Sequence, residues 1–424
     1  MNSQLDPEYF NYMEIESTNT AIRAETTYSA TDPQTVRSSK KQISLKGWRL
    51  KWAHYVHLIN NVIVVIRVYK SPIKIFRLLR RFRNIRIQLT GKNHLGKLIK
   101  IKDRYFWRLG VPGWESPIFH RFLLTELNRI EPHNRKVNRV ISTFIAVTKK
   151  CPLRCEHCFE WKNLNQPERL SIEDIENIII NMQAVGTSNI DITGGEPMLR
   201  AKELAPLIAK YNKDSAFWIL TSGFNFTEEN AKMLADAGLT GVHVSLDHYL
   251  PAEHDKFRGK EGSYQDAIKA VKYSLDNDLV TCLSVCFTKE TANREFVLSF
   301  LNLAKDLGVG FVQFLEPRAV GHYEGKDVAL TKEQIVLLEE TYNKMNFDRE
   351  YIDYPIIIYH GYYQRRIGCF AAGSRGVYID TNGNMLSCPF CQNNYGSAIS
   401  DDITKTLDSM ESGGCPSFSN KVIL

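Results

Sequence analysis

Three cysteines, Cys151, Cys155 and Cys158, lie within eight residues in the spacing C-x3-C-x2-C. Three thiolates can hold three irons of a cubane cluster and leave the fourth iron open, where a small molecule could be activated. Zinc ribbons differ, because they use paired C-x2-C units and close all four positions of the metal. Ferredoxin runs also differ, because they carry a fourth cysteine. The spacing therefore predicts an iron–sulfur cluster with one free iron, and a three-cysteine zinc knuckle is the alternative.

A second motif, Gly194-Gly195-Glu196-Pro197, follows about 36 residues after the last of these cysteines, at the end of a strand-like run. Together the two motifs resemble the radical S-adenosylmethionine (radical SAM) superfamily, and the resemblance covers about Ser142 to Arg318. It implies that Cys151, Cys155 and Cys158 hold a [4Fe–4S] cluster. It also implies that S-adenosylmethionine binds the open iron and is cleaved by one electron to a 5'-deoxyadenosyl radical.

The same resemblance implies which residues contact S-adenosylmethionine. The amino group is expected near Gly194, Gly195 and Glu196, and His157 is expected to stack near the adenine. For hydroxyls and carboxylates at strand ends the alternative is strand-end capping, and for Arg258 it is a simple ion pair. The expected cofactor contacts are Gly194, Gly195, Glu196, Pro197, Ser222, Ser245, Asp247, His157 and Arg258.

The elements that must position these motifs alternate regularly from about residue 142. Strand-like runs are followed by helix-like runs, which implies right-handed crossovers and a parallel sheet. Six such units predict an α/β fold, a partial (β/α)6 barrel, over residues 141–330. In such barrels the chemistry sits at the carboxyl ends of the strands. The expected strands are Phe144–Thr148, Ile190–Thr193, Phe217–Thr221, Gly241–Leu246, Leu279–Phe287 and Phe311–Leu315.

The charge of the chain is unevenly distributed. The 424 residues carry a net charge of +7. Lys46 to Arg104 contains 16 Lys and Arg against one Asp, so this segment has +15 and the remainder has 7 − 15 = −8. We read residues 1–45, which are rich in polar side chains, as a flexible tail. Residues 46–140 are then a basic, helical N-terminal extension.

A basic amphipathic helix is expected to begin at Ser71-Pro72, an N-cap followed by a proline at the first helical position. Such a helix can lie on an anionic membrane surface, grip an acidic peptide or nucleic acid, or pack on the barrel with a solvated basic face. The preceding apolar centre, Val62–Ile66, is too short to span a bilayer. Met1–Thr20 is polar and lacks the apolar core of a signal peptide. We expect a cytoplasmic protein, with the inner face of the membrane as a second location.

The C-terminal part of the chain contains a second set of cysteines. The spacing Cys369-x13-Gly383-x4-Cys388 resembles the opening of the SPASM domain, and the shorter twitch domain with one auxiliary cluster fits better. The resemblance implies an auxiliary [4Fe–4S] cluster on Cys369, Cys388, Cys391 and Cys415, in which the role of Cys391 stays open. A zinc site is the alternative. We expect residues 331–365 to be a connecting helix and linker, and residues 366–424 to be a β-hairpin and cysteine-rich cluster domain.

These patterns predict a radical SAM enzyme that abstracts a hydrogen atom from its substrate. By family analogy the substrate is a ribosomally made peptide or protein. A membrane lipid or lipid-linked substrate is one alternative, and a non-catalytic iron–sulfur binding protein is another. A reducing partner such as a flavodoxin or ferredoxin is expected, and nucleic acid is not. The patterns identify no catalytic base or radical quencher.

Overall fold

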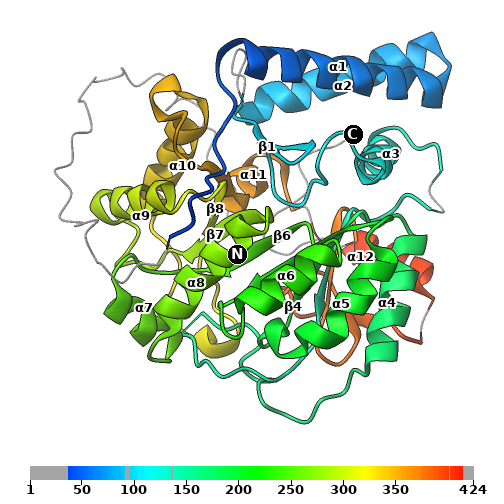
Figure 1. The fold of residues 1–424 in the computed structure, drawn as a ribbon. Helices are drawn as coiled ribbons and strands as arrows, with labels where there is room; N and C mark the ends of the chain where they lie inside the picture. The colour runs from blue at the N-terminus through cyan, green and yellow to red at the C-terminus, as the bar shows by residue number, and fades with distance from the viewer. Residues whose placement is uncertain are drawn as a thin grey trace.

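The computed structural model describes residues 37–90, 96–134, 137–369, 371, 373–400 and 402–413. Within these residues one sheet of ten strands has the order β12-β11-β10-β3-β4-β5-β6-β7-β8-β9 (Figure 1). A separate hairpin pairs β1 (Ile99–Ile101) with β2 (Arg104–Phe106). The ten strands are β3 Ser142–Ala146, β4 Asn189–Thr193, β5 Ala216–Thr221, β6 Gly241–Ser245, β7 Val280–Cys286, β8 Phe311–Leu315, β9 Ile356–Tyr359, β10 Gly376–Ile379, β11 Asn384–Leu386 and β12 Asn394–Ser397.

The strands β3 to β8 are parallel and neighbour one another in chain order, with helices between them. This confirms the predicted partial barrel of six units, and each predicted strand overlaps an observed one. The helices are α1 Gly47–Tyr69, α2 Pro72–Thr90, α3 Pro117–Ile130, α4 Ile172–Ala184, α5 Ala201–Tyr211, α6 Glu228–Asp236, α7 Pro251–Arg258, α8 Ser263–Asp276, α9 Arg294–Leu307, α10 Lys332–Phe347, α11 His360–Ile367 and α12 Ile403–Gly413.

Local signals in the sequence explain where these helices begin and end. Ser171 caps α4, and its side chain and that of Asp174 each accept a hydrogen bond from the other's backbone N–H. This reciprocal capping box satisfies two N–H groups that the helix start leaves without partners. The Asn293 side chain caps α9 by accepting from the backbone N–H of Phe296 at 2.9 Å, and Gly308 ends that helix in a left-handed conformation. Such signals fix the crossover helices, and thereby the strand ends that they connect.

The C-terminal part of the chain continues the barrel sheet, and here the predicted boundaries were wrong. The expected linker of residues 331–365 contains β9, which pairs in parallel with β8. The expected separate domain of residues 366–424 contains β10, which pairs in parallel with β3. A four-residue apolar run such as β9 is too short for periodicity to reveal it, so only the tertiary pairing defines it as a strand. The predicted hairpin around Gly383 is confirmed, since β10 and β11 are antiparallel.

The first described residues pack on the barrel, which corrects the expected tail of residues 1–45 at its C-terminal end. The Ser38 hydroxyl donates a hydrogen bond to Asp276, and Lys40 forms an ion pair with Asp278 at 2.9 Å. The Gln42 side chain donates to the carbonyl oxygen of Leu279 at 2.6 Å. Residues 37–45 are therefore held in place, while the rest of the expected tail, residues 1–36, lies outside the described residues.

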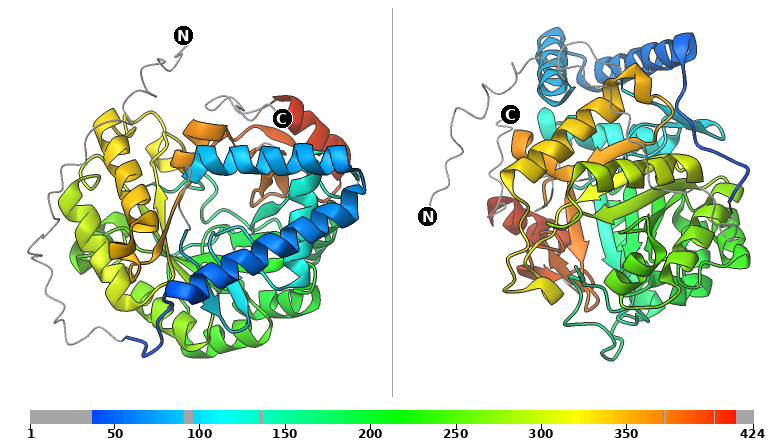
Figure 2. Two further views of the ribbon diagram at one scale, coloured as in Figure 1. Left: turned by 90° about the horizontal axis from the view of Figure 1, so that it is seen from above. Right: turned by 90° about the vertical axis from the view of Figure 1, so that its left-hand side faces the viewer.

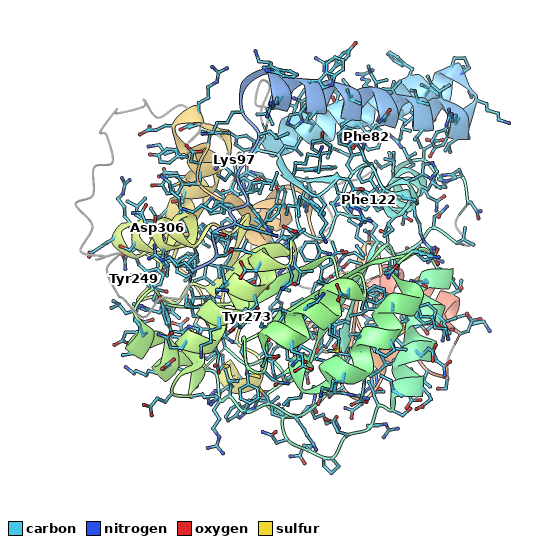
Figure 3. All side chains as sticks on the ribbon, in the orientation of Figure 1. Phe82, Lys97, Phe122, Tyr249, Tyr273 and Asp306 are labelled. Carbon is cyan, nitrogen blue, oxygen red and sulfur yellow. The ribbon has the colours of Figure 1, made fainter. Side chains whose placement is uncertain are left out.

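Helices α1 and α2 lie across one end of the molecule (Figure 2). Their inner faces pack on α3 and the segment before it, in a cluster that includes Val65, Tyr69, Leu78 and Leu127. Phe82 of α2 and Phe122 of α3 belong to this contact (Figure 3). A second apolar cluster fills the amino-terminal end of the barrel; it includes Phe106, Leu109, Trp218, Phe311 and Ile356. No helix in the described part of the chain is long and apolar enough to cross a membrane.

Candidate active site

The loop after β3 is held against the loop after β4 by backbone hydrogen bonds. The N–H of Gly195 donates to the carbonyl oxygen of Thr148 at 2.7 Å, and the N–H of Glu196 donates to that of Lys150 at 2.8 Å. The three cysteines of the first motif follow directly, with Cys155 buried and Cys151 and Cys158 half-buried. The structure therefore brings the two predicted motifs side by side at the carboxyl ends of adjacent strands.

Glycine is required at both positions of this contact. Gly194 has φ +134°, and a Cβ there would lie 2.6 Å from the carbonyl oxygen of Thr148. A Cβ on Gly195 would overlap the carbonyl oxygen of Lys150. Any side chain would push the cysteine loop away, so the two glycines set how closely the motifs approach each other.

The carboxylate of Glu196 is buried and lies at the centre of a hydrogen-bond network. It accepts from the Thr221 hydroxyl at 2.7 Å, from the Ser222 hydroxyl at 2.6 Å and from the backbone N–H of Ser222 at 2.9 Å. Burial nevertheless raises the pKa of Glu196 above its usual value. Ser222 thus contacts Glu196 directly, and the buried Pro197 begins a 3-10 helix (η2, Pro197–Arg200).

Arg258 lies beside the first cysteine group but is paired within the protein. Its guanidinium contacts the Asp247 carboxylate at 2.5 Å and donates a hydrogen bond to the Cys155 sulfur at 3.5 Å. The Asp247 carboxylate also accepts from the backbone N–H of Cys286 at 2.9 Å. For Arg258 the ion-pair alternative is therefore the one observed. Asp247 fixes this arginine, and a direct contact between Asp247 and the cofactor stays a prediction.

His157 and Ser245 are the remaining residues that the first motif and the strand ends predicted. The His157 ring stacks on Phe257 at a centroid distance of 5.2 Å, and burial lowers the pKa of His157 to about 4, so the imidazole is neutral. Ser245 ends β6 and is half-buried. Both side chains line the central cavity of the barrel.

The second cysteine group consists of Cys369, which precedes β10, and Cys388 and Cys391, which follow β11. All three are half-buried. The backbone N–H of Cys391 donates to the Cys388 sulfur at 3.1 Å. Hydrogen bonds from the Cys391 side chain and from backbone N–H groups lower the pKa of Cys388 to about 6. Cys415, the fourth expected member, lies outside the described residues.

One cavity of about 670 Å³ joins the two cysteine groups. It is lined by Cys151, Cys155 and Cys158 from the first group and by Cys369, Cys388 and Cys391 from the second. Helix α11 also contributes to its wall, through His360, Gly361 and Gln364. The barrel interior is therefore a single chamber with thiol groups from two distant parts of the sequence.

A polar belt of four residues crosses the middle of this cavity, and the sequence analysis missed it. It consists of Asp191, His243, Ser284 and Gln313, from β4, β6, β7 and β8. Gln313 accepts from the Ser284 hydroxyl at 3.0 Å and contacts the His243 ring at 3.3 Å. Alternate residues of a strand face the same side, so the sequence contained this signal as polar residues facing inward on four strands.

The two belt residues that can ionise are both shifted toward their neutral forms. Burial raises the pKa of Asp191 to about 7, although its carboxylate accepts from Ser142 at 2.9 Å and Asn189 at 2.7 Å. Burial lowers the pKa of His243 to about 4, and its Nε2 atom has no hydrogen-bond partner in the structure. The belt thus presents polar but mostly uncharged groups to the cavity.

The arrangement of the thiols bears on what they can bind. Within the residues that the structure describes, no three His, Cys, Asp or Glu side chains are grouped as the ligands of a single metal ion. A cubane cluster is held differently, with one thiolate on each iron. Cys151, Cys155 and Cys158 line a cavity of about 670 Å³, which fits a cubane cluster with a small ligand beside it.

Fold and site define the class of protein: a partial α/β barrel whose cysteine-lined cavity opens at the carboxyl ends of the strands. Residues 145–308 match the family model described as the Radical SAM superfamily. The chain is 31% identical over 222 residues to a GTP 3',8-cyclase of Helicobacter pylori, a match that covers 50% of this chain and 67% of that protein. A GTP 3',8-cyclase of Desulforamulus reducens is 31% identical over 201 residues, with 45% and 59% covered.

Solved structures show the same fold. The crystal structure of Streptococcus suis SuiB bound to S-adenosylmethionine superimposes with a TM-score of 0.54 at 16% identity, covering 70% of this chain and 72% of that one. SuiB bound to its precursor peptide SuiA gives a TM-score of 0.53. This chain belongs to the radical SAM superfamily. Enzymes of this superfamily use a [4Fe–4S] cluster and S-adenosylmethionine as cofactors.

Proposed function

We propose that this protein uses Cys151, Cys155 and Cys158 to hold the [4Fe–4S] cluster that cleaves S-adenosylmethionine, and that it modifies a substrate bound between the two cysteine groups. The observation that carries this proposal is the single cavity lined by both groups. When bound, the cluster and S-adenosylmethionine supply a 5'-deoxyadenosyl radical, which removes a hydrogen atom from the substrate. The protein's own residues supply position and exclude water.

Several side chains are suited to hold S-adenosylmethionine beside Cys151, Cys155 and Cys158. The Glu196 carboxylate lies in the cavity wall and can accept from the amino group, while Ser222 fixes its orientation. Ser245 and the neutral His157 ring line the same cavity and can contact the ribose and adenine. Arg258 acts as a positioning residue, since its hydrogen bond to the Cys155 sulfur stabilises negative charge there.

The second cysteine group is suited to an auxiliary iron–sulfur cluster. Cys369, Cys388 and Cys391 face the same cavity, and Cys415 is the expected fourth ligand. The low pKa of Cys388 favours the thiolate form that binds iron. A cluster held by these cysteines would supply electron-transfer chemistry at the wall of the same cavity.

A peptide segment fits the cavity better than GTP, the substrate named for the curated relatives. The arginines in the cavity wall already have partners: Arg258 pairs with Asp247, Arg375 with Glu126, and Arg318 lies 3.9 Å from Glu316. Arg108 stacks on the Tyr363 ring at 4.4 Å. A triphosphate needs clustered cations that can turn toward it, whereas the mostly neutral polar belt suits the amide groups of a polypeptide.

A lipid or lipid-linked substrate is the second candidate. Seven apolar side chains of α1, from Trp48 to Ile66, are between 39% and 72% exposed. That surface would place the enzyme next to lipids.

The test begins with the full chain, reconstituted with iron and sulfide under anaerobic conditions and reduced by dithionite or a flavodoxin. We expect 5'-deoxyadenosine from S-adenosylmethionine, and its loss in Glu196→Gln. Small peptides encoded beside this gene, GTP and lipid extracts are then compared as substrates by mass spectrometry. A peptide lighter by two hydrogens supports the proposal. A cyclised GTP product would overturn the peptide assignment, and a modified lipid would favour the second candidate.

A further inference from the structure

Helix α1 carries a stripe of apolar side chains that faces away from the protein. The stripe follows helical spacing, so its members lie above one another along the whole helix. Trp48 is 72% exposed, Trp52 60% and Tyr55 57%, while Ile59 and Ile63 are each 39% and Ile66 is 50% exposed. Scattered apolar residues on a surface are ordinary, but a continuous stripe rich in aromatic residues marks a binding surface. We call these six residues the α1 stripe.

The α1 stripe is not the face that holds the helix in the fold. The opposite face of α1 carries Ala53, Val65 and Tyr69, which are buried against α2, α3 and the segment before it. The Tyr69 hydroxyl also donates to the carbonyl oxygen of Leu127 at 3.0 Å. Helix α1 therefore has two apolar faces, of which one stabilises the fold and the other is left in water.

Helix α2 places positive charge beside this stripe. Its exposed side carries Arg77, Arg80 and Arg83, and two strongly exposed apolar residues, Ile73 at 72% and Phe76 at 69%, lie near its start. Between Lys46 and Ile87 the chain has 11 Lys and Arg and no Asp or Glu. Both helices lie across the same end of the molecule (Figure 2), so the exposed apolar residues of α1 and the exposed arginines of α2 belong to that end.

We propose that the α1–α2 hairpin lies flat on an anionic lipid surface, with the α1 stripe inserted at the boundary between headgroups and acyl chains and the arginines of α2 on the lipid phosphates. Tryptophan and tyrosine prefer this boundary because their rings are apolar and carry one polar group. Arginine binds phosphate through paired N–H donors. The hairpin thus supplies both components of interfacial binding, an inserted apolar face and a cationic face.

The charge excludes a second copy of this chain as the preferred occupant of the surface. Two hairpins face to face would bring together two sets of exposed arginines, Arg77, Arg80 and Arg83, and the chain has no Asp or Glu between Lys46 and Ile87. Like charges in contact are destabilising, whereas phosphates neutralise them. This inference does not depend on the proposed substrate, because the α1 stripe shares no residue with the cavity lining.

The test uses the full, reconstituted chain and sedimentation with vesicles of phosphatidylcholine alone or with 30% phosphatidylglycerol. We expect binding to the anionic vesicles only, accompanied by a blue shift of tryptophan fluorescence. About half or more of the binding should persist at 500 mM salt, because salt does not screen the insertion of an apolar face. Binding that salt abolishes completely would overturn insertion, and absent or equal binding to both vesicles would overturn the proposal.

Variants locate the binding surface. Trp48→Ser with Trp52→Ser should weaken vesicle binding about tenfold or more, and Arg77→Gln with Arg80→Gln should remove the preference for anionic lipid. Ile180→Ser with Val336→Ser is the matched control, since these residues are 44% exposed each but lie on α4 and α10. All variants should still form 5'-deoxyadenosine. Unchanged vesicle binding in the tryptophan variant would contradict the proposal. Self-association of the parent protein in lipid-free solution would also contradict it if the tryptophan variant abolished that self-association.

Discussion

The two cysteine groups of this protein are held in different ways. The first lies on a loop whose backbone is pressed against Gly194 and Gly195, and burial raises the pKa of Cys151 and Cys158 to about 12. The second lies on the segments before and after the β10–β11 hairpin, where hydrogen bonds lower the pKa of Cys388 to about 6. Local backbone packing thus sets the position of the first group. The position of the second group depends on a distant part of the chain that pairs with the barrel.

This difference separates two tasks. The first group is set by residues within one βαβ unit, so its geometry can remain the same whatever the substrate is. The second group depends on the pairing of β10 with β3, which brings a distant part of the chain to the barrel. We expect perturbations of the first group to stop all chemistry, and perturbations of the second to stop only the completion of the reaction.

The largest effect is expected from removing one cysteine of each group. Cys155→Ser should reduce 5'-deoxyadenosine formation to background, because the cluster loses one of its three ligands. Cys388→Ser should leave 5'-deoxyadenosine formation within about threefold of the parent but lower the iron content and abolish the finished product. Iron analysis and mass spectrometry measure both. Cys282→Ala, a buried thiol outside both groups, is the control, and equal loss of cleavage in the Cys388 variant would refute the division of tasks.

A side chain at the contact between the motifs is expected to have the next largest effect. Gly195→Ala places a Cβ against the carbonyl oxygen of Lys150, so the cysteine loop must move. We expect a loss of about 1–3 kcal/mol in unfolding free energy and a strong drop in cofactor cleavage. Gly262→Ala is the matched control, because Gly262 has φ +80° and open space around it. Its cost should be about 1 kcal/mol, with cleavage retained. Similar cleavage in both variants would argue against close packing as the cause.

Asp191 in the polar belt predicts a pH dependence of stability. Its pKa is about 7 in the folded protein and about 3.9 in the unfolded chain. The folded protein therefore binds the extra proton between about pH 4 and pH 7, and its stability falls as the pH rises through that window. In the folded parent this costs up to about 4 kcal/mol of unfolding free energy, a cost that Asp191→Asn should remove. Relative to the parent, the variant should therefore be stabilised most at pH 8 and little at pH 5. Urea unfolding at both pH values measures this, and parallel pH profiles would contradict it.

The smallest effect on S-adenosylmethionine cleavage is expected at the contact between the two cysteine groups. The Tyr378 hydroxyl of β10 donates a hydrogen bond to Glu160 of the first cysteine loop, and Glu160 also accepts from Asn163 at 2.8 Å. Tyr378→Phe leaves the Glu160 carboxylate with fewer donors, which should cost about 1–3 kcal/mol in unfolding free energy. Cleavage of S-adenosylmethionine should persist, since Asn163 remains. A complete loss of cleavage would show that the first group depends on the second after all.

Much of the fold and of the first site could be predicted from sequence, and the reasons are local. The six strand–helix units have apolar runs long enough for their period to show, and caps such as Ser171 and Asn293 mark helix starts. Both motifs are short and contiguous. The sequence left the partner of Asp247 open, because a carboxylate at a strand end can turn toward a ligand or toward an arginine. Only the position of Arg258, which comes from the following helix, decides between them.

Residue types and their spacing establish which chemical groups this protein has: three thiols at cluster spacing, a glycine-rich motif and a basic N-terminal extension. The positions of these groups relative to one another follow only from the tertiary structure. In the folded chain β9 and β10 pair with the barrel strands, and four strands contribute the residues of the polar belt. Both cysteine groups line one cavity, and one apolar face of α1 is exposed. The physical reason is that residue type and spacing report local preference, whereas pairing, burial and exposure depend on contacts between residues far apart in the chain.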